Sequence, residues 1–266
     1  MGRGGANKNR KPGAVAVGAG SARGVASAPA VGANWSPGAK ELARRVEHAA
    51  ETKRSDRRGD DLRSHFIVDR GAGKVAPELE RAFQAIQQAH TIRGLRPVRV
   101  RVVDGRSHRG CFVRSQIPGD YTIEVGREDR APAAVFVHEV AHYLDAHGFG
   151  DQDTAELASE NGDVFAQWRT AVRASAYYSD VDRKCVVSVS QRQMEVSRYE
   201  YLLSDRELFA RSYMQWIALR SQDEVLLAQV NEGRREGIPT QWADDDFASI
   251  AAALDELIDG NEHLQP

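Results

Sequence analysis

VFVHEVAHYLDAH, residues 135–147, is the stretch that decides the fold. An α-helix turns about 100° and rises about 1.5 Å per residue, so His138 and His142 project about 40° apart and lie about 6 Å apart along the axis. Both imidazoles can therefore bind one metal ion, and Glu139, about 60° from His142, can reach a water on that ion without binding it. The alternative is a helix whose core histidines are satisfied by hydrogen bonds. The uncharged neighbours, however, predict a buried helix in which unpaired histidines would be costly.

The segments on either side of this stretch predict a mixed α/β fold. Pro132 begins the helix and Gly148 ends it. Upstream, the segments YTIEV (121–125) and VRVRVVD (98–104) have the character of short half-buried strands, and the helical spacing of apolar residues over 77–92 predicts an amphipathic helix. We expect an α/β (α+β) arrangement in which a small sheet lies over the active-site helix and a mainly helical C-terminal part follows.

The N-terminal segments have a different composition. Residues 1–38 are rich in Gly and Ala, hold five Lys and Arg but no acid, and have almost no large apolar side chain before Trp35. Such a segment cannot recover the entropy lost on ordering, so we expect a disordered basic arm. Residues 39–76 have a charged, helix-compatible pattern, which predicts a partly exposed helical segment. The folded domain is then expected to span residues 77–266.

Charge is distributed unevenly along the chain. Residues 1–130 hold 25 Lys and Arg against 14 Asp and Glu, whereas residues 131–266 hold 11 against 24, so the halves carry +11 and −13 and sum to −2. A basic half can bind nucleic acid by releasing counterions, which keeps nucleic acid as an alternative partner that we do not favour. No apolar run reaches the roughly 20 residues of a membrane span, so no span is expected.

The cysteines indicate the compartment. Cys111 and Cys185 are far apart in the sequence, which argues against both a disulfide scaffold and a cysteine-based zinc module. A reducing compartment is the simpler interpretation. We therefore expect a cytoplasmic protein, or a virion-associated or secreted one without a recognisable signal peptide, because glycines and Arg23 interrupt the only weakly apolar N-terminal stretch, residues 13–20.

The HEVAH helix, its apolar flanks and the strand DYTIEV (120–125) resemble the active-site region of the zincin metallopeptidases. That resemblance implies Zn²⁺ held by the two histidines and a substrate-binding edge strand, here Tyr121–Val125 or Val98–Asp104. Gly148 stands where a metzincin would have its third histidine. The resemblance therefore favours the gluzincin type, whose third ligand is a Glu on a later helix.

The segment DRELFARSYMQW (205–216) supplies the third ligand in this interpretation. Its Glu207-Leu-Phe-Ala core, followed by Tyr213, resembles the third-ligand helix of the anthrax lethal factor peptidase domain and its relatives. Asp145, three residues after His142, is similar to that family too, and the two motifs cover about 75 residues. The longer stretch through PTQWADDDF also resembles predicted metallopeptidases encoded in phages and mobile elements.

Other interpretations of this segment are open. Ser204 to Glu207 fits a capping box, in which Glu207 would only accept from the backbone N–H of Ser204. Glu160, 18 positions after His142, matches the ligand spacing of another gluzincin branch, although a glycine interrupts its expected helix. Arg211 is spaced to form an i,i+4 pair with Glu207 or to steer a substrate carboxylate.

Three residues are candidates beside the ligands. Asp145 lies one turn below His142, where its carboxylate could orient the imidazole or simply end the helix in solvent. Tyr199 and Tyr201 precede Glu207 by eight and six positions. Lethal-factor-like enzymes place a tyrosine that helps to stabilise the oxyanion in this region, and ordinary core or surface packing is the alternative.

The sequence thus predicts a zinc-dependent peptidase, an endopeptidase rather than an exopeptidase, that cleaves a protein or peptide. His138, His142 and Glu207 would bind Zn²⁺, and Glu139 would be the general base for a metal-activated water. The alternatives are a catalytically silent zincin fold that serves as a structural or interaction protein in a virion or toxin delivery system, and nucleic-acid binding by the basic N-terminal half.

Overall fold

The computed structural model describes residues 62–104, 109–114, 120–150, 157–190 and 196–265. The expected basic arm and residues 39–61 lie outside this part of the chain. Residues 62–75 form the short 3-10 turns η1 (Leu62–Ser64) and η2 (Arg70–Val75) and the strand β1 (Phe66–Val68). Because β1 pairs with a strand of the sheet, the folded domain includes residues that precede Pro77.

A four-stranded sheet forms one part of the fold, with the order β1-β3-β5-β4. Strands β1, β3 (Val98–Val103) and β5 (Tyr121–Gly126) run parallel, and β4 (Gly110–Arg114) runs antiparallel to β5. Val98 and Val100 are fully buried and alternate with exposed arginines, so the prediction of a half-buried strand is confirmed.

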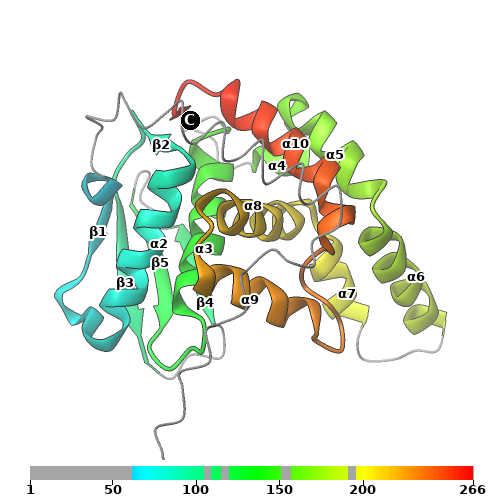
Figure 1. The fold of residues 1–266 in the computed structure, drawn as a ribbon, viewed down its shortest axis with the longest axis horizontal. Coiled ribbons are helices and arrows are strands. Elements are labelled where there is room, and N and C mark those ends of the chain that lie inside the picture. Colours follow the sequence, from blue (N-terminus) through cyan, green and yellow to red (C-terminus); the bar gives the residue numbers. More distant parts are fainter. Residues whose placement is uncertain (1–61, 105–108, 115–119, 151–156, 191–195, 266) are drawn as a thin grey trace, which may run out of the picture. The chain divides into compact units, whose positions relative to one another are not determined.

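Two helices pack on this sheet (Figure 1): α2 (Ala76–Ala89) and α3 (Pro132–His147), which contains the HEVAH residues. The two helices also pack against each other. The ring of Phe136 on α3 meets Phe66 of β1 and Phe83 of α2 edge-on, with centroids 5.5 and 5.1 Å apart. A mixed α/β fold in which the helix with the HEVAH residues packs on a small sheet is therefore confirmed.

The prediction that β5 or β3 is the edge strand beside the HEVAH helix is wrong. Both β3 and β5 have a strand neighbour on each side. Among the described strands, the edge strand that contacts α3 is β4. Its sequence, GCFVR, begins with Gly and Cys and has no clear alternation of apolar and polar residues, so the sequence does not mark it as a strand.

The rest of the described chain is mainly helical, as expected. Two of its strands are very short: β2 (Thr91–Ile92) pairs with β6 (Leu264–Gln265) near the end of the chain. The helices after α3 are α4 (Ala158–Asn161), the 3-10 turn η3 (Asp163–Phe165), α5 (Ala166–Arg173), α6 (Ala176–Ser190), α7 (Val196–Leu203), α8 (Asp205–Ser221), α9 (Glu224–Arg234) and α10 (Asp244–Asp259). Within the described residues, no helix combines the length and the apolar character that crossing a membrane requires.

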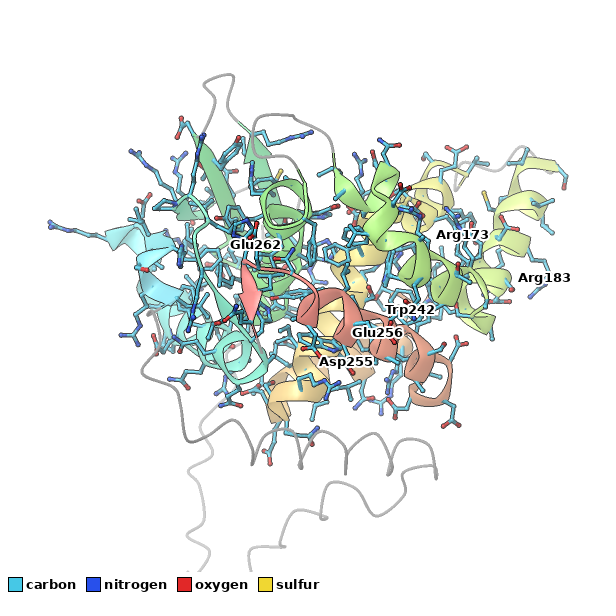
Figure 2. All side chains as sticks on the ribbon, turned by 90° about the horizontal axis from the view of Figure 1, so that it is seen from above. Arg173, Arg183, Trp242, Asp255, Glu256 and Glu262 are labelled. Carbon is cyan, nitrogen blue, oxygen red and sulfur yellow. The ribbon has the colours of Figure 1, made fainter. Side chains whose placement is uncertain are left out.

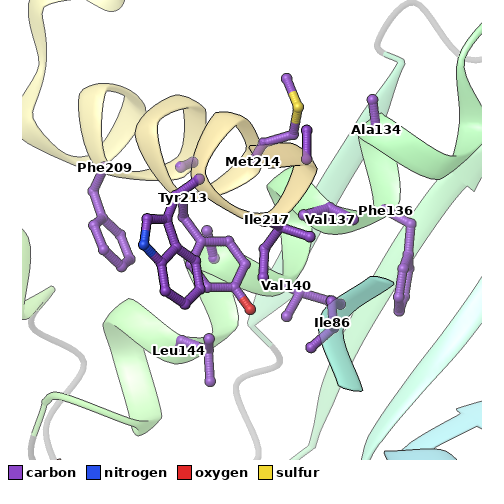
Figure 3. Packing of buried hydrophobic residues seen from close by; sticks show 14 of the residues in the cluster. Ile86, Ala134, Phe136, Val137, Val140, Leu144, Phe209, Tyr213, Met214 and Ile217 are labelled. Atoms are coloured by element: carbon purple, nitrogen blue, oxygen red, sulfur yellow. The ribbon is translucent and has the colours of Figure 1, made fainter. Parts of the chain in front are cut away.

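Helix α8 is the central element of this helical part. It packs against α2, α3, α9 and α10, and its residues from Glu207 to Ala218 are all buried. Figure 3 shows the apolar side chains that α3 and α8 bring together, Val137, Val140, Leu144, Tyr213, Met214 and Ile217. A helix that is buried on all sides cannot slide or rotate without breaking this packing, so its first turn is held firmly beside α3.

Two polar contacts join α8 to the C-terminal part of the chain. Gln215 both donates to the carbonyl and accepts from the N–H of Trp242, each at 3.0 Å. Asp255 on α10, labelled in Figure 2, accepts from Trp216 Nε1 at 2.8 Å and pairs with Arg220. These bonds fix α8 against α10 and the segment that precedes it.

Candidate metal centre

The two histidines of α3 face each other across one turn of the helix. His138 Nε2 and His142 Nε2 are 3.2 Å apart, and the ring planes are 84° apart with centroids separated by 4.9 Å. Only one hydrogen bond can form between these two nitrogens, because one of them must donate its N–H and the other must accept with its lone pair. A cation accepts both lone pairs at once, which this arrangement favours.

Glu207, at the start of α8, completes the group. Its Oε2 lies 3.3 Å from His138 Nε2 and its Oε1 lies 3.4 Å from His142 Nε2. The three side chains offer one ligand atom each, and these atoms all lie within 4.8 Å of one another. Among the described residues, this cluster of His138, His142 and Glu207 is therefore a candidate metal site.

The chemistry of these residues fits a bound cation. Glu207 Oε2 is buried and accepts no hydrogen bond, although it lies close to His138. Burial raises the pKa of Glu207, but the neighbouring imidazoles of His138 and His142 outweigh it and hold that pKa well below its usual range. Burial lowers the pKa of His142, yet Glu207 more than compensates and the net shift is upward. A negative carboxylate between two imidazoles is thus stable only with positive charge beside it.

The capping-box interpretation of Glu207 does not match the structure. The backbone N–H of Ser204 donates to Tyr201 O at 3.2 Å, and Ser204 Oγ donates to the same carbonyl at 2.8 Å. Ser204 therefore neither caps α8 with its side chain nor offers its N–H to Glu207. The rival ligand Glu160 is exposed on α4 and does not belong to the candidate metal group.

Glu139 lies beside this group and is 6% exposed. Its carboxylate lies close to β4, with Oε1 2.8 Å from the position of a Cβ built on Gly110. Burial raises the pKa of Glu139, while His138, His142 and the Phe112 N–H oppose that shift. Sequence reasoning missed the Phe112 contact, because it depends on β4, and its only signal was the short apolar stretch Cys111–Val113.

The two candidate tyrosines differ in their surroundings. Tyr201, on α7, is half-exposed and lies close to Glu207. Burial and the charge of Glu207 raise the pKa of Tyr201 well above its usual range, so the hydroxyl keeps its proton. Tyr199 is buried in the hydrophobic core.

Asp145 and Arg211 hold the helices that carry the group. Asp145 is fully buried and accepts from the backbone N–H (2.7 Å) and Oγ (2.5 Å) of Ser159, which ties α3 to α4. Burial raises the pKa of Asp145 to about 6. Arg211 is buried and donates from Nε to the backbone carbonyl of Glu207 at 3.1 Å, and it also binds Leu202 O and the Tyr177 hydroxyl. Its buried position corrects the expectation that it pairs with the Glu207 carboxylate or steers a substrate.

Comparison of the chain with protein-family models, with curated proteins and with solved structures finds no match. The class of the protein is therefore stated from its fold and its candidate site alone. It is a mixed α/β protein with a candidate His-His-Glu metal centre between its sheet-bound helix and its helical part.

Proposed function

We propose that the protein is a zinc-dependent peptidase of the gluzincin type, an endopeptidase that cleaves protein or peptide substrates. The observation that carries this proposal is the convergence of His138, His142 and Glu207, with Glu139 next to them in the HEVAH sequence. Two histidines and one carboxylate form a donor set of catalytic zinc sites, which keep a fourth position open, whereas structural zinc sites are closed and usually contain cysteine.

Zinc in such a site lowers the pKa of a water and polarises a peptide carbonyl. Glu139 supplies the base: its buried carboxylate accepts a proton from the attacking water and passes it to the leaving amine. Burial shifts the pKa of Glu139 upward, toward neutral pH, and such a pKa suits a group that must both accept and return a proton.

The remaining groups orient the substrate. Tyr201 keeps its proton and lies close to Glu207, so its hydroxyl can donate to the oxygen that becomes negative during attack. β4 borders α3 and has a described strand neighbour on one side only, so an extended peptide can add along its other edge. A peptide that pairs with such an edge can extend past the site in both directions, so the bond that is cleaved can be internal, as in an endopeptidase.

The test combines metal content with cleavage. We expect about one zinc per chain by elemental analysis and loss of most of it in His138→Ala and His142→Ala. We also expect cleavage of members of a peptide library by mass spectrometry, and a loss of about 10²- to 10⁴-fold in turnover for Glu139→Gln with zinc retained. Absence of zinc after reconstitution refutes the proposal, and zinc binding without Glu139-dependent cleavage assigns the fold to a catalytically silent protein.

A further inference from the structure

The direction of the backbone groups of β4 decides what this strand can contact. Gly126 N donates to Arg109 O at 2.9 Å, and Cys111 is registered opposite Glu124. In an antiparallel ladder, alternate residues direct their N–H and C=O groups toward the same neighbouring strand. The backbone N–H and C=O groups therefore point toward β5 in Arg109, Cys111 and Val113. Those of Gly110 and Phe112 point the other way, toward the outer edge of β4.

The Glu139 carboxylate lies against β4, because its Oε1 is only 2.8 Å from the position that a Cβ at Gly110 would occupy. The N–H of Phe112 points away from β5, and it opposes the upward shift that burial gives the pKa of Glu139, which reaches the strand from α3. The Phe112 ring meets Tyr143, one turn farther along α3, with centroids 6.2 Å apart. The strand and the helix are thus in contact at two successive turns.

Gly110 gives this contact the room it needs. A Cβ at this position would collide with Val135 Cγ1 and lie 2.8 Å from Glu139 Oε1 and 3.0 Å from Glu139 Cγ. Gly110 is not among the glycines with positive φ, so its backbone conformation does not require glycine. The reason for glycine at this position is the close approach of strand and helix.

We propose that Gly110 is a positioning residue that lets β4 lie close enough to α3 for the Phe112 N–H to hold the Glu139 carboxylate. The catalytic part of this inference rests on the proposed function, in which Glu139 is the base. The bond fixes the direction of the carboxylate and leaves its second oxygen for the proton of the attacking water. It also places the base beside the strand edge along which a peptide would lie.

The first experiment measures the bond itself, without metal or substrate. Amide hydrogen exchange of Phe112 is followed by NMR in the unmutated protein, Glu139→Ala, Gly110→Ala and the pair Val135→Ala and Val135→Ala/Gly110→Ala. The Val135→Ala background removes the collision with the valine, so the double variant folds even if Gly110→Ala does not. Gly71→Ala is the matched control, because a Cβ at Gly71 meets nothing within 4 Å.

We expect the Phe112 amide to exchange about tenfold faster or more in Glu139→Ala and in the double variant, since each loses a hydrogen bond to a charged acceptor. Val135→Ala and Gly71→Ala should exchange at the rate of the unmutated protein. An unchanged Phe112 rate in the double variant, relative to Val135→Ala, overturns the proposal whether or not the protein binds zinc.

The second experiment tests the consequence for catalysis. With a peptide that the unmutated zinc protein cleaves, the double variant should lose about 10²-fold in kcat relative to Val135→Ala, with zinc content and KM unchanged. An equal kcat shows that the position of Glu139 does not depend on Gly110. If the unmutated protein cleaves no peptide, the proposed function fails, and the exchange rates alone decide the role of Gly110.

Discussion

The side chains of His138, His142 and Glu207 place two facing nitrogen atoms and an unpaired carboxylate oxygen in a partly buried cluster in which Glu207 is buried. A buried polar atom without a partner costs free energy, and a buried charge costs more. One cation can satisfy all three side chains at once, whereas a single proton on one imidazole nitrogen can be donated to only one of the facing acceptors. At the scale of single residues, the cluster is therefore better suited to binding a metal than to stabilising the metal-free fold.

The identity of the third ligand follows from this argument and is testable. Glu207→Gln should weaken zinc binding by about 100-fold or more, because it replaces a carboxylate ligand by a neutral amide. Its melting temperature without metal should change by only a few degrees, since Glu207 does not cap α8. Competition with a chromogenic chelator measures the affinity, and Glu160→Gln, at an exposed position, is the control. Full affinity in Glu207→Gln with loss in Glu160→Gln would reverse the assignment.

The two tyrosines make a second matched comparison. Tyr201→Phe should lower kcat by about 10²-fold, the usual effect of removing one oxyanion donor, with little change in zinc affinity. Tyr199→Phe should leave kcat within about twofold, because Tyr199 is part of the hydrophobic core. Steady-state kinetics on the same peptide checks both variants. Equal kcat for Tyr201→Phe and the unmutated protein would remove Tyr201 from the mechanism.

The residues of the site could be predicted unequally well from the sequence. His138 and His142 were predicted because both ligands lie on one helix, where spacing alone fixes their geometry. Glu207 needed a resemblance, since its approach to α3 depends on how two helices pack. The approach of Glu139 to β4 was not predictable, because the direction of the backbone groups of a strand carries no signature in the sequence and depends on strand register.

At the scale of elements, α3 and α8 are helices whose buried apolar surfaces hold the candidate metal ligands in place. The bounds of α3, from Pro132 to His147, were predicted correctly because proline and glycine mark its ends and its first six residues are apolar. β1 and β4 were missed because they have three and five residues and no clear alternation. Their pairing is decided by neighbours that are distant in the sequence, which also explains the wrong edge strand.

One substitution at two positions measures the packing between α3 and α8. Val140 is fully buried in their shared cluster, whereas Val186 on α6 is 62% exposed. Val140→Ala should lower the free energy of unfolding by about 2 kcal/mol, and Val186→Ala should change it by less than about 0.5 kcal/mol. The gain in helix propensity is the same for both variants, so their difference isolates burial. Urea unfolding without metal checks this, and equal effects would show that the interface does not stabilise the fold.

For the whole molecule, the dependence of stability on pH combines two buried groups at the C-terminal end of α3. Burial raises the pKa of Asp145 to about 6, so the folded state binds its proton more tightly than the unfolded state does. That contribution makes the fold less stable as pH rises from about 4 to about 6. His147 acts in the opposite direction. Burial lowers the pKa of His147 to about 4, and the charges of Arg114 and Arg96 add to the shift.

The contribution of His147 can be separated by substitution. Its ring lies 4.0 Å from that of Tyr121, and its buried Nε2 has no hydrogen-bond partner, so nothing stabilises a proton there. Between pH 6.5 and pH 4 the unfolded state binds this proton and the folded state does not, so stability is lost as pH falls through this window. His147→Phe keeps an aromatic ring and removes the titrating group. We therefore expect the variant to gain stability relative to the unmutated protein by up to about 3 kcal/mol from pH 7 to pH 4.

Urea unfolding of both proteins at several pH values measures this difference, and the subtraction cancels Asp145, which both proteins share. His147→Gln provides the control, because it also lacks the titrating group but buries an amide that needs partners. It should be less stable than His147→Phe at every pH and yet show the same reduced dependence on pH. A constant difference between His147→Phe and the unmutated protein would mean that His147 titrates alike in the folded and unfolded states, and therefore that the end of α3 is open to water.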